Sequence, residues 1–305
     1  MPATKVLLDT DIGSDIDDAV CLAYLLRQPD CELLGISTVT GEPQKRAALA
    51  DAVCRAAGRK NIPIHSGCNT AILGGIIQPE CPQAAILPRF DHRVPEEFKP
   101  NTAVQFLREM IHSHPNEITL LAIGPMTNLG LLFSLDPDVP KLLKSLVLMC
   151  GIFTHRLNGT GPSNREWNAL NDPLATAITY RAAVASHISI GLEVTCKCKM
   201  PSGECVERFK TIGGPLSVVS AATEIWSKHG SHVTFHDPLA ATTIFKPEIC
   251  QYADGRVDVE IKSDFVPGMT LFNEKAPAKP HRIAVDVNPE MFFEHYFGIT
   301  GNGKH

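Results

Sequence analysis

Short apolar runs alternate with amphipathic stretches along most of this chain. The apolar runs predict buried strands at residues 5–11, 31–41, 62–67, 118–124, 145–151 and 187–194. The amphipathic stretches predict helices at residues 17–28, 42–58, 101–114, 126–135 and 172–184. Because the two kinds alternate and the strands are apolar throughout, we predict an α/β fold. Its sheet is open, mainly parallel and Rossmann-like, with helices on both faces.

The last third of the chain departs from this alternation. Residues 201–236 are predicted to be mostly helical, and residues 254–262 and 282–288 are predicted to be late strands in a hairpin or at a sheet edge. The sequence contains no repeat, low-complexity linker or clear domain break. We therefore predict a single domain over residues 1–305.

Composition and charge narrow the class of protein. The 305 residues are 44% hydrophobic and 20% charged, which is typical of a globular chain with a sizeable core. A net charge of −5 gives no general attraction to nucleic acid or anionic lipid, so neither is expected as a partner. Apolar runs stay below the roughly 18 residues of a membrane helix, and the first residues lack the apolar stretch of a secretory signal. We expect a cytoplasmic protein.

The ten cysteines are scattered along the chain, and Cys21, Cys54 and Cys150 lie in apolar runs. Such cysteines are typically buried free thiols. Cys196 and Cys198 form a close pair, but no second pair with zinc-site spacing accompanies them. We therefore expect free thiols and no zinc site.

Five aspartates follow the first predicted strand: Asp9, Asp11, Asp15, Asp17 and Asp18. One or two of them can cap the next helix, where the free N–H groups and the helix dipole favour carboxylates. Capping does not account for all five, because carboxylates that converge on one strand end repel one another unless a cation lies among them. Oxygen ligands favour a hard cation, Ca²⁺ or Mg²⁺. The sequence therefore predicts a metal site at this strand end.

Other predicted strand ends supply candidate partners for this site. They are Glu42, the Ile123 carbonyl, His236 and Asp237, together with a dense polar run after residue 151 that contains Asn164, Glu166, Trp167, Asn168, Asn171 and Asp172. Each also has an ordinary structural interpretation. His236 and Asp237 can cap a helix, Asp172 with the following proline can begin one, and the polar run can be a solvated loop.

Several motifs together resemble the inosine–uridine preferring nucleoside hydrolases. They are DTDIGSDIDDA at residues 9–19, AIGPMTN at 122–128, EWN at 166–168, FHDP at 235–238 and VPGMT at 266–270. The resemblance extends over nearly the whole chain. It implies the nucleoside hydrolase fold and hydrolysis of the N-glycosidic bond of ribonucleosides, in nucleoside catabolism or salvage. It also implies a tightly held Ca²⁺ and a homo-oligomer, either a dimer or a tetramer.

The resemblance assigns roles residue by residue. It implies that Asp11 is the general base and a metal ligand, and that Asp18, Asp237 and the Ile123 carbonyl complete the metal site. Asp17, Asn168 and Glu166 would bind the 2′-, 3′- and 5′-hydroxyls of ribose, and His236 would protonate the departing base. Asp9 would support the carboxylates. Aromatic side chains that can contact the base are Trp167, Trp226, His229 and Phe235.

Three departures from the family pattern bear on the substrate. The aspartate motif is two residues longer than usual and contains the additional Asp15. Glu42 stands where an asparagine is common, so a charge is expected in the sugar pocket. Asn164 is the nearest match to a residue at the 5′-hydroxyl, with Asn158 as its rival.

In the expected chemistry, the metal-bound water loses its proton to Asp11 and attacks an oxocarbenium-like ribosyl centre. We expect His236 to donate a proton to the base because a histidine pKa lies near neutrality. Two alternatives remain open. A haloacid dehalogenase-type phosphatase would use Mg²⁺ and Asp9 as nucleophile, and a non-catalytic Ca²⁺-dependent protein would bind sugar without turnover.

Overall fold

A computed structural model describes residues 2–153, 165–228 and 230–301 of the chain. Within these ranges, nine strands form one sheet in the order β10-β9-β11-β6-β5-β4-β1-β2-β3. Their bounds are β1 (Thr4–Thr10), β2 (Cys31–Thr38), β3 (Ile64–Ser66), β4 (Ile118–Ala122), β5 (Ser145–Met149), β6 (His187–Ile190), β9 (Cys250–Val259), β10 (Thr270–Asn273) and β11 (His281–Val287). A separate antiparallel pair joins β7 (Lys199–Pro201) to β8 (His232–Thr234).

The sheet is parallel from β11 to β3, whereas β9 pairs antiparallel with both β11 and β10. The predicted late strands therefore form an antiparallel edge, and the prediction of an open, mainly parallel α/β sheet is confirmed. Strand order reverses between β1 and β4, because the chain first adds β2 and β3 on one side and later adds β4 to β6 on the other. Ligands of open α/β sheets bind at such a switch point, beyond the carboxyl ends of the strands.

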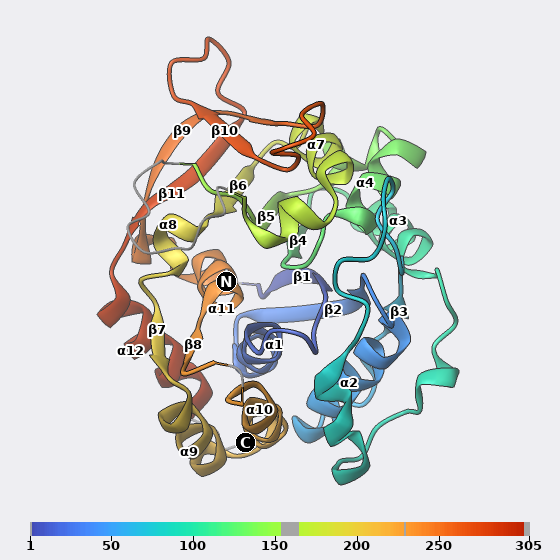
Figure 1. The fold of residues 1–305 in the computed structure, drawn as a ribbon, viewed down its shortest axis with the longest axis vertical. Helices are drawn as coiled ribbons and strands as arrows, with labels where there is room; N and C mark the ends of the chain where they lie inside the picture. Colours follow the sequence, from blue (N-terminus) through green and yellow to red (C-terminus); the bar gives the residue numbers. More distant parts are fainter. Residues whose placement is uncertain (1, 154–164, 229, 302–305) are drawn as a thin grey trace.

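Helices cover both faces of the sheet (Figure 1). One layer consists of α1 (Asp17–Arg27), α2 (Pro43–Ala56), α10 (Pro215–Trp226), α11 (His236–Phe245) and α12 (Pro289–Gly301). The opposite layer consists of α3 (Ala103–Ser113), α4 (Thr127–Leu135), α5 (Val139–Leu142) and α7 (Pro173–Arg181). The remaining helices are α6 (Trp167–Asn171), α8 (Leu192–Thr195), α9 (Ser202–Ile212) and the 3-10 helices η1 (Pro82–Arg89), η2 (Pro95–Glu97) and η3 (Pro247–Ile249).

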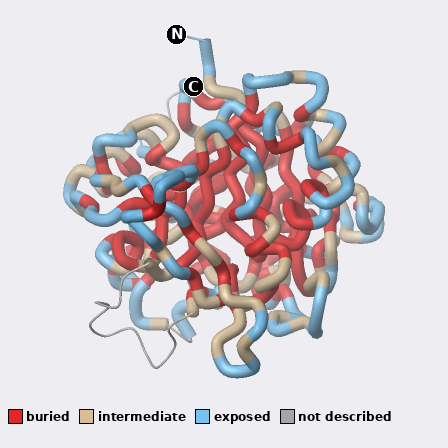
Figure 2. Tube along the Cα trace, turned by 90° about the horizontal axis from the view of Figure 1, so that it is seen from above, coloured by how far each residue is buried: buried red, intermediate tan, exposed pale blue. Residues whose placement is uncertain are grey.

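Successive residues of each central strand pack into opposite layers. Val6 and Leu8 of β1 belong to one hydrophobic cluster, and Leu7 between them belongs to the other. Figure 2 shows the buried interior of the sheet surrounded by exposed connections. This two-sided burial explains why the strands are apolar without alternation in the sequence.

Two sequence predictions need adjustment. Residues 187–194 were predicted as one strand, but β6 ends at Ile190 and α8 follows, because the Leu192 N–H donates to Gly151 O and turns the chain away from the sheet. Residues 201–236 are mostly helical as predicted, although the short strands β7 and β8 flank them. Every helix in the described ranges is too short or too polar to span a bilayer. A single domain over residues 1–305 stays a prediction.

Candidate active site

A cavity of about 820 Å³ opens at the switch point of the sheet. Its lining brings together most of the residues singled out from the sequence: Asp11, Asp15, Asp17, Asp18, Ile123, Glu166, Trp167, Asn168, His236 and Asp237. The aspartate loop follows β1, and Ile123 follows β4. Gly124 lets these two strand ends approach closely, because a Cβ there would lie 2.9 Å from Asp11 Oδ1.

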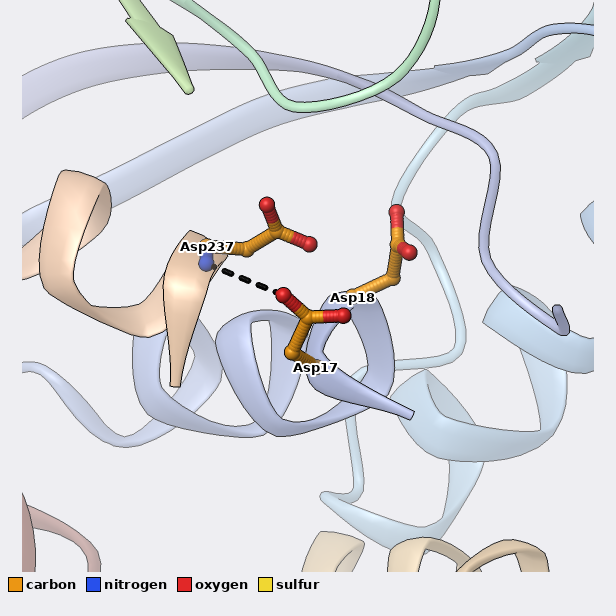
Figure 3. A group of neighbouring side chains, drawn as sticks. All are labelled: Asp17, Asp18 and Asp237. Atoms are coloured by element: carbon orange, nitrogen blue, oxygen red, sulfur yellow. Dashed lines mark hydrogen bonds between the residues drawn. The ribbon is translucent and has the colours of Figure 1, made fainter. Parts of the chain in front are cut away.

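Three carboxylates form the centre of the site (Figure 3). Asp17 and Asp18 begin α1, and Asp237 lies in the first turn of α11. One oxygen from each lies within 4.8 Å of the others. The Asp237 N–H also donates to Asp17 Oδ2 at 3.2 Å, which ties the two helix starts together. Both helix N-termini therefore meet at the carboxylates, where their dipoles favour negative charge.

Burial opposes ionisation of these carboxylates. Asp17, Asp18 and Asp237 are at most 4% exposed, and their pKa values are raised well above the ordinary range by burial first and by neighbouring carboxylates second. Burial also raises the pKa of Asp11 and of Asp15 to about 6. A hard cation would compensate such a cluster, and its all-oxygen donor set fits one. The cluster can therefore bind a metal ion.

The composition of this cluster differs in one respect from the roles implied by the resemblance. Asp17, which was assigned to a ribose hydroxyl, lies within the three-carboxylate cluster. Asp11, which was assigned as a ligand, lines the cavity outside that group of three. Asp15 lines the cavity too, and its Oδ1 accepts from the Ile16 N–H.

Asp9 lies behind the cavity rather than in its lining. It is fully buried, and its Oδ1 accepts hydrogen bonds from Ser37 Oγ and from Asn128 Nδ2, the latter at 2.7 Å. Burial raises the pKa of Asp9 to about 7. This carboxylate connects β1 to β2 and α4, which fits the supporting role and not that of the nucleophile needed by the phosphatase alternative.

Glu166 and Asn168 are held by the protein backbone. Glu166 caps α6, accepting the N–H groups of Asn168 and Ala169 at 2.7 and 3.0 Å, and burial raises its pKa. Asn168 Nδ2 donates to the carbonyls of Ile123 and Met149 at 2.9 and 3.0 Å. The amide of Asn168 thus joins the ends of β4 and β5 beneath the cavity. The ligand roles of Ile123, Glu166 and Asn168 stay predictions.

His236 differs from its expected state. Its Nδ1 lies 2.7 Å from Thr195 Oγ1, and burial lowers the pKa of the imidazole to about 4. This lowered pKa runs against the expectation that the imidazole donates a proton near neutrality, and the role of His236 toward the departing base stays a prediction. Either partner can be the donor in this contact, and in the tautomer that accepts from the Thr195 hydroxyl the ring proton is on Nε2, which can donate a hydrogen bond.

Glu42 does not enter the sugar pocket as expected. Its carboxylate binds Lys45 Nζ and accepts the Cys81 N–H at 2.9 Å, and it lines a different surface hollow. The residue precedes α2 with a left-handed φ of 57°, which carries its side chain out of the cavity lining. Three further candidates lie outside the described residues: Asn164, its rival Asn158, and His229.

The described aromatic candidates fall into two groups, two that line the cavity and one that belongs to the core. Trp167 and Trp226 line the cavity, and Trp167 is 45% exposed there. Phe235 is fully buried against Phe292 and Phe293, so it belongs to the core. Sequence reasoning missed Gln78, Gln83, Leu192 and Ile225, which also line the cavity. No motif marked them, because they come from segments whose position depends on tertiary packing.

A cavity with a buried carboxylate cluster at a switch point defines a small-molecule site that can hold a cation. The chain matches the family model described as inosine-uridine preferring nucleoside hydrolase over residues 6–294, and it belongs to that family. The resemblance inferred from the motifs is confirmed, and so is the predicted enzyme class, nucleoside hydrolase.

Several relatives span nearly the whole chain. It is 28% identical to the inosine-uridine preferring nucleoside hydrolase of Crithidia fasciculata, over 97% of this chain and 96% of that protein. It is 27% identical to uridine nucleosidase 1 of Arabidopsis thaliana, over 88% and 82% of the two chains. Its fold is similar to that of a plant nucleoside hydrolase, with a TM-score of 0.83, 24% identity, and 99% and 100% of the two chains covered. A purine-preferring ribonucleoside hydrolase from Gardnerella vaginalis has a TM-score of 0.82, 21% identity, and 98% and 99% of the two chains covered.

Proposed function

We propose that this protein hydrolyses the N-glycosidic bond of ribonucleosides to ribose and free base. The observation that carries the proposal is the buried cluster of Asp17, Asp18 and Asp237 within a cavity of about 820 Å³, in a chain of the nucleoside hydrolase family. The cavity is large enough for a nucleoside. The named relatives act on uridine, on inosine and uridine, or on purine nucleosides, so the proposal leaves the base open.

We propose Ca²⁺ as the ion, because every candidate ligand is an oxygen, which suits a hard cation, and because the family resemblance implies Ca²⁺ rather than Mg²⁺. Asp11, Asp18, Asp237 and the Ile123 carbonyl are the assigned ligands, and the position of Asp17 adds it to the candidates. When bound, such an ion lowers the pKa of a water molecule and supplies a nucleophile.

The chain's own groups would do the remaining work. The Asp11 carboxylate would take the proton of the attacking water. Asp17 and Asn168 would orient the ribose hydroxyls, with Glu166 holding Asn168 in place through its backbone N–H. The neutral His236 would donate a hydrogen bond from Nε2 to the departing base. Trp167 and Trp226 would cover the base and exclude water from it.

The proposal is tested with a panel of ribonucleosides, with chromatography of the free base, in Ca²⁺ and in chelator. We expect base release from at least one nucleoside in Ca²⁺ and none in chelator. A protein that binds ribose but turns over no nucleoside would instead be a sugar-binding protein. Activity on p-nitrophenyl phosphate alone would identify a phosphatase. Either of these results contradicts the proposal.

We also propose a cytoplasmic location and a homo-oligomeric state, dimer or tetramer. All ten cysteines are free thiols, which fits a reducing compartment. The homo-oligomeric state is proposed because the chain belongs to the nucleoside hydrolase family, whose resemblance implied it. Fractionation of cell extracts tests the location, and light scattering on the purified protein tests the oligomeric state.

A further inference from the structure

Two buried side chains outside the carboxylate cluster contact the aspartate loop. They are Arg46 of α2 and Gln83 of η1, which are 0% and 1% exposed. The two side chains bind the backbone carbonyls of residues 11, 12, 14 and 15, and the backbone N–H of Gln83 binds that of Gly13. We infer that Arg46 and Gln83 are positioning residues that set the geometry of the metal and substrate site. This inference deepens the proposed function and rests on it.

Arg46 binds the first half of the loop. Its Nη1 donates to the carbonyls of Asp11 and Ile12, the second at 3.1 Å, and to Ser14 Oγ at 2.8 Å. Its Nε donates to the carbonyls of Thr40 and Gly41 at 2.9 and 2.8 Å, and its Nη2 donates to Glu80 O at 3.2 Å. One guanidinium therefore joins the loop after β1, the turn after β2 and the segment before η1. Lysine could not reproduce this, since it lacks the rigid planar fork.

Gln83 binds the second half of the loop. Its backbone N–H donates to Gly13 O at 3.1 Å, and its Nε2 donates to the carbonyls of Ser14 and Asp15 at 3.0 and 2.9 Å. Ser14 and Asp15 lie in the part of the motif that is longer than usual in the family. The longer loop is therefore held in one conformation, because the side chain of Gln83 donates hydrogen bonds to its additional carbonyls. With the carbonyls turned toward α2 and η1, the carboxylates of Asp11 and Asp15 line the cavity.

The charge of Arg46 also acts on the site. Among the described residues, no carboxylate lies within ion-pair distance of Arg46, and its hydrogen-bond acceptors are carbonyls and one hydroxyl. No ion pair within the described residues therefore neutralises the positive charge of Arg46. Arg46 therefore orients the loop and also brings a positive charge next to it.

Three variants test the inference: Gln83→Leu, Gln83→Glu and Arg46→Lys. Gln83→Leu keeps the volume and the backbone bond to Gly13 but loses the two side-chain bonds. Gln83→Glu places a carboxylate against two carbonyls, so a larger effect is expected. Gln28→Leu is the matched control, because Gln28 is buried, its Nε2 bonds Tyr24 Oη at 2.8 Å, and it lies at the far end of α1.

Two readouts are needed on each purified variant: the Ca²⁺ concentration that gives half of the maximal thermal stabilisation, and kcat and KM on the best nucleoside. For Gln83→Leu we expect the Ca²⁺ midpoint to rise and kcat to fall, each by about 10-fold or more, as is usual when groups that orient ligands are removed. Arg46→Lys should do the same. Gln28→Leu should lower the melting temperature yet keep the wild-type Ca²⁺ midpoint and kcat.

The inference is overturned if Gln83→Leu keeps the wild-type Ca²⁺ midpoint and kcat, or if Gln28→Leu changes them as much. Should Arg46→Lys fail to fold, the two Gln83 variants decide. The two proposals fail separately. A wild-type protein that binds Ca²⁺ without releasing base contradicts the proposed function, and the Ca²⁺ midpoints still test the positioning role.

Discussion

Neutralising one carboxylate of the cluster should have opposite effects on stability with and without Ca²⁺. Asp237→Asn is the suitable change, because the amide keeps an oxygen and nearly the same volume. With carboxylate oxygens within 4.8 Å of one another, each ionised pair repels by about 3 kcal/mol at an effective dielectric constant of 20. The wild-type cluster relieves part of this by binding protons. We therefore expect Asp237→Asn to stabilise the metal-free protein by about 1–3 kcal/mol.

In saturating Ca²⁺, Asp237→Asn should lower the free energy of unfolding instead of raising it. Free Ca²⁺ at about 1,000 times its Kd stabilises a protein by about 4 kcal/mol. For a chain of 305 residues, each kcal/mol shifts Tm by about 1.5 °C, so chelation should lower the wild-type Tm by about 6 °C. Asp237→Asn weakens the site and should show a smaller Ca²⁺-dependent shift.

Melting curves in Ca²⁺ and in chelator measure both effects on the same preparations. Asp254→Asn is the control, because Asp254 pairs with Arg282 at the surface, away from the cavity. That variant should keep the full wild-type response to Ca²⁺. The reasoning is refuted if Asp237→Asn melts below wild type in chelator, or if it responds to Ca²⁺ as strongly as wild type does.

Three further predictions follow from the site and the core. Ribonucleosides should be cleaved about 10⁴-fold faster than their 2′-deoxy analogues, because a site that binds a hydroxyl discriminates strongly against its absence; comparable kcat/KM values for the two would contradict this. His236→Ala should slow inosine hydrolysis by about 10²–10³-fold, as for the loss of one hydrogen-bond donor to a departing anion, but barely affect p-nitrophenyl riboside, whose leaving group is stable without one; equal losses would indicate a binding or structural role. Burial lowers the pKa of His187 to about 3. As the pH falls below about 6.5, the imidazole takes up a proton in the unfolded chain but not in the folded one. The free energy of unfolding is therefore highest above about pH 6.5 and declines as the pH falls toward 3. At pH 5 this costs about 2 kcal/mol. Between pH 8 and pH 5, the free energy of unfolding from urea titrations should therefore fall by about 2 kcal/mol more in wild type than in His187→Leu; equal falls would show that His187 is not responsible.

The sequence by itself determined the layers of the fold and the position of the chemistry. Continuous apolar strands are required when both faces of a sheet are covered, so the parallel sheet could be predicted from local pattern alone. The aspartates after β1 and the Ile123 segment after β4 could be placed at the same edge for the same reason. Their convergence follows from parallel strands ending together.

Only the tertiary structure decided how these groups meet and in which state. Asp17 and Asp237 are 220 residues apart, and the contact between α1 and α11 brings them within hydrogen-bonding distance. Glu42 leaves the cavity because its left-handed backbone and its bonds to Lys45 and Cys81 direct it elsewhere. Local sequence contains neither kind of information, because each depends on what packs against the residue.

Burial and distant donors account for the remaining differences. Burial lowers the pKa of His236, and no motif records the depth at which a side chain lies. The donors of the aspartate loop, Arg46 and Gln83, come from segments without a recognisable signature. A pattern of side chains predicts which groups reach a strand end, whereas the packing of backbone carbonyls against buried donors decides where each carboxylate lies.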